Sequence, residues 1–263
     1  MRFAIIDAHA HCGIQDAYPP QGIEDYYAEV KGSEILGVVA FPPVMEIYDR
    51  YDPNFEDTPG WKERRQRANN YLLGLEGWGL AVFPFFFIWN DFAVDQLAPG
   101  HKGIKWHRHG GEPHYHYEDP KCKAAVEEIR RRNMPVCFEE EWDYSLQFIN
   151  EIAPDLRIII PHCGLMNGGY ERFCRFGIWE RPNIFTDTSL VSSQVILDYV
   201  KHYGHQRIMF GSDFPFGDPV HEYQKILKLQ LSETEKEALL MGNMQGLLAN
   251  VNRPPQDSPP SDG

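Results

Sequence analysis

The stretch Asp7-Ala8-His9-Ala10-His11 follows directly on the short apolar run Phe3-Ala4-Ile5-Ile6. This run predicts a buried strand because it is apolar, partly β-branched and soon followed by a glycine. Alternate side chains of a strand lie on one face, so we expect His9 and His11 to point to the same side, with Asp7. Two imidazoles placed in this way can hold one metal ion. A His-x-His pair alone is weak evidence, and the rest of the chain gives it weight.

Further apolar runs alternate with helical patterns along the chain. The predicted strands after the first are 37–41, 81–89, 103–107, 135–139, 157–162, 184–187 and 207–210. The predicted helices are 61–74, 122–132, 144–152 and 193–203, and a last one that begins at the capping box of Ser232 and Glu235 and ends near Asn250. Strands that are apolar throughout are typical of a parallel sheet covered by helices. The sequence therefore predicts an α/β fold, a single-domain (β/α)8 TIM barrel over residues 1–250, with a disordered tail at 251–263.

Composition limits the classes of partner and the compartment. With 25 basic and 38 acidic residues the net charge is −13, which argues against nucleic acid or an anionic membrane and leaves a small-molecule substrate. The chain has no apolar window long enough to cross a bilayer and no signal-peptide pattern, so we expect a cytoplasmic protein. The five cysteines show no paired spacing and are expected to be reduced. Assembly into a homo-oligomer is left open.

Several reactive residues stand at the ends of the predicted strands. In a (β/α)8 barrel the catalytic groups lie at the carboxyl ends of the strands. In this chain those positions hold His9 and His11, Lys105 and His107, Glu139, His162, and Asp213. The fold thus predicts that residues far apart in the sequence meet in one site.

Five motifs resemble those of the metal-dependent amidohydrolase superfamily, in its amidohydrolase-related branch of small hydrolases and non-oxidative decarboxylases. They are IIDAHAH at 5–11, GIKWH at 103–107, PVCFE at 135–139, RIIIPHCG at 157–164 and RIMFGSDFPFG at 207–217. The resemblance covers about residues 3–248 and is most specific in its first and last motifs.

The resemblance implies a divalent metal held by His9, His11 and Asp213, with Glu139 and His162 as further candidate ligands. By the same resemblance, His162 either binds the metal or contacts the substrate and the attacking water. Zinc is favoured, with manganese or iron as alternatives, and one ion is favoured over two. Glu139 stands where the family commonly has a histidine. A carboxylate there adds negative charge and shifts metal preference somewhat towards harder ions. The simpler interpretation of Glu139 is a solvated charge run that continues into the two glutamates after it.

Lys105 has two interpretations. In binuclear relatives a lysine on this strand is carbamylated and bridges two metals, whereas in a mononuclear site Lys105, like His107 on the same face, would contact the substrate. The loop beyond supplies His109, whose imidazole either contacts the substrate or faces solvent. Arg108 and Arg172 are candidates for recognising a substrate carboxylate.

The candidate roles define three functional hypotheses. A metal lowers the pKa of water to roughly 7, Asp213 acts as general base and then acid, and His162 stabilises the developing oxyanion. The leading hypothesis is a hydrolase that cleaves a C–N or C–O bond of a small polar amide, ester or lactone. The alternative is a decarboxylase of a small aromatic or enol acid, and the third is a non-catalytic metal-binding barrel. The sequence identifies no particular substrate.

Overall fold

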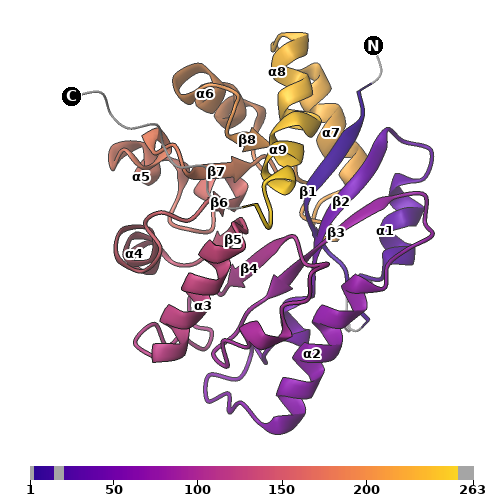
Figure 1. The fold of residues 1–263 in the computed structure, drawn as a ribbon. Coiled ribbons are helices and arrows are strands. Elements are labelled where there is room, and N and C mark those ends of the chain that lie inside the picture. The colour runs from indigo at the N-terminus through magenta and orange to yellow at the C-terminus, as the bar shows by residue number, and fades with distance from the viewer. Residues whose placement is uncertain (1–2, 15–20, 254–263) are drawn as a thin grey trace.

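The structure, a computed structural model, describes residues 3–14 and 21–253. Within these ranges eight strands form one sheet in the order of the sequence, ringed by helices (Figure 1). This is the predicted (β/α)8 TIM barrel. Most of the predicted tail, residues 254–263, lies outside the described ranges, and the barrel ends with a helix that finishes at Ala249.

Every predicted strand is present, and each pairs in parallel with the next. The strands are β1 (Ile5–His11), β2 (Ile35–Phe41), β3 (Ala81–Phe87), β4 (Gly103–His107), β5 (Val136–Glu139), β6 (Ile158–Ile160), β7 (Ile184–Asp187) and β8 (Ile208–Met209). Because all run in one direction, their carboxyl ends meet at one mouth of the barrel.

The ring closes between β1 and the segment that follows β8. Ala8 N donates to Phe210 O at 2.9 Å, Asp213 N donates to His9 O at 2.8 Å, and a backbone bridge joins Ala10 to Phe214. This seam brings the last motif of the sequence against the first.

The Asp7 carboxylate reinforces the seam. It accepts hydrogen bonds from Ser212 N at 2.9 Å, from Ser212 Oγ at 2.6 Å and from the Tyr26 hydroxyl at 2.9 Å. The register of β1 against β2 is irregular between Asp7 and Ala10. Asp7 therefore faces the seam. The sequence had predicted that it would lie on the same side as His9 and His11, and this prediction was wrong.

Helices cover the outside of the ring. They are α1 (Ile23–Val30), α2 (Pro59–Leu73), α3 (Pro120–Arg131), α4 (Trp142–Gln147), α5 (Tyr170–Arg175), α6 (Ser193–Tyr203), α7 (Pro219–Lys228), α8 (Glu233–Glu237) and α9 (Asn243–Ala249). The capping box of Ser232 and Glu235 is confirmed at the start of α8. Helices α1, α5 and α7 were not predicted; the first two are short and begin at a glycine without a side-chain cap.

Three strands end earlier than predicted, namely β3 at Phe87, β6 at Ile160 and β8 at Met209, and the last two lead into site residues. After β6, Pro161 cannot donate to the sheet and His162 takes a left-handed φ of 55°, so His162 lies in a turn rather than on the strand. After β8, Asp213 also has a left-handed φ, of 59°. Both side chains are therefore presented by turns at the mouth.

Apolar residues fill the structure in two clusters. One lies between the sheet and the helices, and a smaller one fills the barrel interior with Val39, Phe85, Cys137 and Ile159, joined by Met244 of α9. All five cysteines are free, and no helix in the described ranges is long and apolar enough to cross a membrane.

The seam gives a first prediction. Ser212→Ala removes one hydrogen bond to the buried Asp7 carboxylate, and the free energy of unfolding should fall by about 1–3 kcal/mol. The midpoint of urea unfolding measures the loss. Ser193→Ala, an exposed serine on α6, is the control and should stay within about 0.5 kcal/mol. An unchanged midpoint for Ser212→Ala would show that the seam does not depend on this contact.

Candidate active site

Two histidines of β1 and the aspartate after β8 converge at the barrel mouth. The Nε2 atoms of His9 and His11 lie 3.3 and 3.4 Å from the same oxygen, Asp213 Oδ1. All three residues are buried. Burial lowers the pKa of His9 to about 4 and that of His11 to about 3, and it raises the pKa of Asp213. Both imidazoles are therefore neutral at pH 7, the form that binds a metal.

The spacing of these atoms fits a divalent ion. Ligand bonds of about 2.1 Å in tetrahedral geometry place neighbouring ligand atoms about 3.4 Å apart. The measured 3.3 and 3.4 Å separations match that value, and two imidazoles with one carboxylate are a common ligand set for zinc. The ligand atoms of His9 and His11 lie within 4.8 Å of each other.

Asp187, at the end of β7, orients His9. Its Oδ2 lies 2.8 Å from His9 Nδ1. Because a carboxylate only accepts, Nδ1 carries the proton and Nε2 keeps its lone pair for the ion. The same carboxylate accepts from His162 N at 3.1 Å and from the Ser189 hydroxyl. Burial works to raise the pKa of Asp187, but His9 and His162 hold it well below its usual range.

Lys105 lies beside these groups, inside the barrel. Its Nζ is 3.4 Å from His9 Nε2, 3.2 Å from Glu139 Oε2 and 4.6 Å from the centre of the Phe41 ring. Burial works to lower the pKa of Lys105, but Cys137, Glu139 and Asp213 raise it above its usual range. An ammonium has no lone pair with which to attack carbon dioxide, so this environment does not favour a carbamate.

Glu139 lies with the histidines of β4 and the following loop rather than with the first three residues. Its Oε1 is 2.6 Å from His109 Nε2 and 3.4 Å from His107 Nε2. Burial works to raise the pKa of Glu139, but His107 and Lys105 hold it well below its usual range. Three ligand atoms, one each from His107, His109 and Glu139, form a second group that could hold a metal.

Arg50 decides the tautomer of His109. Arg50 Nη2 lies 2.8 Å from His109 Nδ1, and a guanidinium has only donors, so Nδ1 must accept. The proton of a neutral His109 is therefore on Nε2, which donates it to Glu139. Arg50 is itself anchored, because its Nε donates to Glu112 Oε1 at 2.7 Å.

His162 enters the mouth from the turn after β6. Its Nδ1 lies 3.1 Å from Ser189 O, and its Nε2 lies 3.8 Å from Glu139 Oε2. Burial works to lower the pKa of His162, but Glu139, Asp187 and Asp213 raise it to about 9. At pH 7 this imidazole is a cation that can donate a hydrogen bond.

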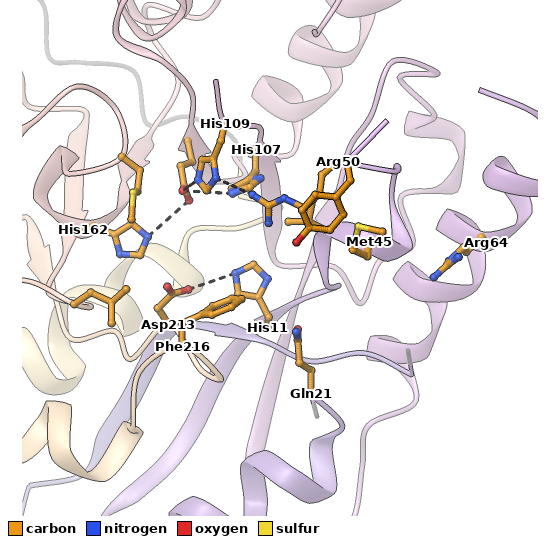
Figure 2. Close-up of a pocket in the computed structure, with 15 residues that line it drawn as sticks. His11, Gln21, Met45, Arg50, Arg64, His107, His109, His162, Asp213 and Phe216 are labelled. Carbon is orange, nitrogen blue, oxygen red and sulfur yellow. Dashed lines mark hydrogen bonds and ion pairs between the residues drawn. The ribbon is translucent and has the colours of Figure 1, made fainter. Parts of the chain in front are cut away.

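These residues border a cavity of about 650 Å³ (Figure 2). Six of the residues predicted from the sequence line it, namely His11, His107, His109, Glu139, His162 and Asp213. Two others, His9 and Lys105, are fully buried next to it.

Two predicted residues lie elsewhere. Arg108 is buried, and its guanidinium donates to Glu140 at 2.7 Å and to Glu141 at 3.1 Å. Arg172 lies over the Trp142 ring and borders a second hollow of about 560 Å³. The geometry therefore gives neither of them a place in the cavity beside the metal ligands.

Sequence reasoning missed three residues of the site. Asp187 ends a predicted strand, which was a usable signal. Arg50 and Arg64 line the cavity, but the first is in a loop and the second is on the predicted helix 61–74, which was given no role in the site. Only the folded chain shows which charges on such segments face inward.

A parallel barrel with this cluster at its mouth is the arrangement of a metal-dependent (β/α)8 enzyme. The model of the amidohydrolase family matches residues 99–245, more than half of the chain, and the chain belongs to this family of enzymes that act on small molecules. This membership confirms the resemblance found in the sequence and sets the non-catalytic hypothesis aside. Among curated proteins none matches the chain.

Solved structures share the fold across nearly the whole chain. The 2,6-dihydroxybenzoate decarboxylase from Rhizobium has a TM-score of 0.70 and 15% identity, covering 94% of this chain and 99% of its own. A dihydroxybenzoic acid decarboxylase from Polaromonas, solved with manganese and an inhibitor, has a TM-score of 0.69 and 14% identity. The match covers 94% of this chain and 97% of the decarboxylase. A proposed 2-pyrone-4,6-dicarboxylic acid hydrolase from Pseudomonas putida has a TM-score of 0.65 and 15% identity. The match covers 95% of this chain and 98% of the hydrolase. At such identities the likeness shows the fold alone.

The orientation of His9 by Asp187 can be tested. Asp187→Asn should weaken zinc binding about 10- to 100-fold, because the amide no longer fixes the proton on His9 Nδ1. Competition with a fluorescent chelator measures the affinity. Asp95→Asn, at an exposed aspartate, should bind zinc as the natural chain does. Equal zinc affinity in the two variants would show that Asp187 does not orient His9 for metal binding.

Proposed function

We propose that this enzyme is a hydrolase that cleaves a C–N or C–O bond of a small polar amide, ester or lactone with one divalent ion, zinc being favoured. The ion is held by His9, His11 and Asp213. The observation that carries the proposal is the meeting of two imidazole nitrogens and one carboxylate oxygen at the spacing of metal ligands, on the border of a cavity of about 650 Å³.

A single ion is supported by the other contacts. In the second group the proton of His109 is on Nε2, the atom that would have to bind a metal, and Arg50 blocks the opposite tautomer. Lys105 forms an ion pair with Glu139 at 3.2 Å, which occupies the amine that a bridging carbamate would need. Glu139 then acts by holding Lys105 and His109 in place.

The residues around the ion divide the catalytic work. A divalent ion supplies polarisation of a carbonyl and lowers the pKa of water from 15.7 to roughly 7. Asp213 Oδ1 faces the two histidines, which leaves Oδ2 to take a proton from the attacking water and pass it to the leaving group. His162 lines the same cavity and donates a hydrogen bond to the developing oxyanion.

Decarboxylation of a small aromatic or enol acid is the second candidate. It is supported by the likeness to two decarboxylases over 94% of the chain. In this reaction the bond from carbon to the carboxylate breaks, carbon dioxide leaves, and the carbon takes a proton from Asp213 or His162, which both line the cavity.

Assays of the two reactions separate the candidates. Zinc- or manganese-loaded protein is screened for carbon dioxide release from aromatic and enol acids, and for hydrolysis of amides, esters and lactones. Hydrolysis without carbon dioxide release is the expected result. Carbon dioxide release alone would replace the hydrolase by the decarboxylase.

Asp213→Asn tests the catalytic base in whichever assay succeeds. The amide cannot take the proton and is a poorer ligand, so turnover should fall about 10²- to 10⁴-fold. Asp218→Asn, which alters only the capping residue of α7, is the control. Unchanged turnover in Asp213→Asn would contradict the assignment.

Metal content tests the ligand set. Elemental analysis should find one equivalent per chain in the natural protein and in Glu139→Gln, and much less in His11→Gln. Loss of metal in Glu139→Gln would make Glu139 a ligand. Two equivalents in the natural protein would contradict the single ion.

A further inference from the structure

One side of the cavity is formed by apolar side chains that are open to solvent. Of the nine large apolar side chains that are exposed in the described ranges, four border this cavity, namely Tyr51, Met166, Leu190 and Phe216. The last three come from the loops after the neighbouring strands β6, β7 and β8. Single exposed apolar side chains are normal, but a group that gathers at one cavity indicates a binding surface. We call Met166, Leu190 and Phe216 the apolar wall.

Leu190 has a backbone conformation that leucine avoids. Its φ is 58°, in the left-handed region, where a bulky side chain is strained. The residue before it is held in place, because Ser189 donates to the Asp187 carboxylate and its Oγ lies 2.8 Å from His162 Nδ1. One turn therefore orients His162 and presents Leu190 to the cavity. Glycine or asparagine would fit this φ better, so the strain points to a use for the leucine side chain.

The apolar wall begins beside a candidate metal ligand. The Phe216 ring meets the His11 ring edge to face, with 6.0 Å between their centres, and Figure 2 shows the two side by side. Leu190 lies against the chain after Phe216, since a side chain at Gly217 would come within 3.1 Å of Leu190 Cδ2. Met166 borders both the cavity and the second hollow. A group attached directly to a carbonyl at the metal site therefore lies along this wall.

The lining of the cavity suits an aliphatic chain. Four of its apolar side chains are aliphatic, namely Val44, Met45, Met166 and Leu190. Flexible side chains such as methionine adapt to a ligand of irregular shape. In Figure 2 Arg50 and His109 lie across the cavity from Phe216. These two are already bonded to each other, and to Glu112 and Glu139, so a ligand is not needed to satisfy them.

We propose that the apolar wall binds an aliphatic chain attached to the carbonyl that reacts, and that Leu190 determines the preference for this chain. The substrate is then an ester, amide or lactone whose reacting group is polar and whose remainder is apolar. This inference rests on the proposed function for the position of the carbonyl, but the wall itself depends only on the cavity. Burial of the exposed apolar surface of the wall and of the chain favours binding.

A series of alkyl hydroxamates tests the wall in the full-length protein. The hydroxamate group binds a divalent ion, and acetohydroxamate, butanohydroxamate and hexanohydroxamate differ only in the length of the chain. Calorimetry measures their affinities for zinc-loaded and for chelator-treated protein. A fully buried methylene is worth about fourfold in affinity, so with half-buried methylenes hexanohydroxamate should bind about 15-fold more tightly than acetohydroxamate. Without metal both bind more weakly, but their ratio of affinities should be kept.

Leu190→Asn removes the apolar side chain with little change in volume and accepts the left-handed φ. It should reduce the ratio of affinities about threefold or more, while the melting temperature stays the same or rises. Leu190→Met, which stays apolar, should keep the natural ratio. Leu227→Asn is the matched control, because Leu227 on α7 has the same exposed fraction of 37% but lies outside the lining of the cavity.

Three results would overturn the proposal. The natural ratio in Leu190→Asn would show that Leu190 does not contact the chain, and a lower melting temperature with that ratio would make it a packing residue. A ratio near one in the natural protein would show that the wall does not bind a chain. Tighter binding of benzohydroxamate than of hexanohydroxamate would replace the aliphatic chain by a ring.

The two proposals fail in different ways. If the ratio depends on Leu190 in chelator-treated protein while no ester, amide or lactone is hydrolysed, the apolar wall stands and the hydrolase falls. If acetyl and hexanoyl esters are hydrolysed with equal kcat/KM, the apolar wall falls and the hydrolase stands.

Discussion

The seam between the first strand and the segment after the last is the constraint on which the site depends. The Asp7 carboxylate accepts two hydrogen bonds from Ser212, and the backbone of Asp213 donates to His9 O. One closure thus joins the ring and places the carboxylate of Asp213 against both histidines of β1. Without it, the three candidate ligands would belong to opposite ends of an open sheet.

Beyond the seam, hydrogen bonds fix which ring nitrogen carries the proton in two histidines of the site. Asp187 sets the proton of His9 on Nδ1 and leaves Nε2 for an ion, whereas Arg50 sets the proton of His109 on Nε2 and directs it to Glu139. These two histidines, which belong to different candidate metal groups, therefore differ in which ring nitrogen carries the proton. The positions of these ring protons, rather than the number of imidazoles, support a single ion.

The order of the strands and most cavity residues could be predicted from the sequence, because strands of a parallel barrel present their ends at one mouth. The end of β6 before His162 and the left-handed turn at Asp213 could not, because local patterns do not show that these two residues take a positive φ. The positions of Arg50, Arg64 and Arg108 could not be predicted either. Whether an arginine lies in a cavity or in a buried ion pair depends on contacts with distant segments, which local patterns do not contain.

The central claim is that one divalent ion is bound by His9, His11 and Asp213. Anomalous diffraction from crystals of the zinc-loaded protein tests it most directly. The account predicts one peak at full occupancy, about 2.0–2.2 Å from both Nε2 atoms and from the Asp213 carboxylate. A peak between His107, His109 and Glu139, alone or with the first, would contradict it.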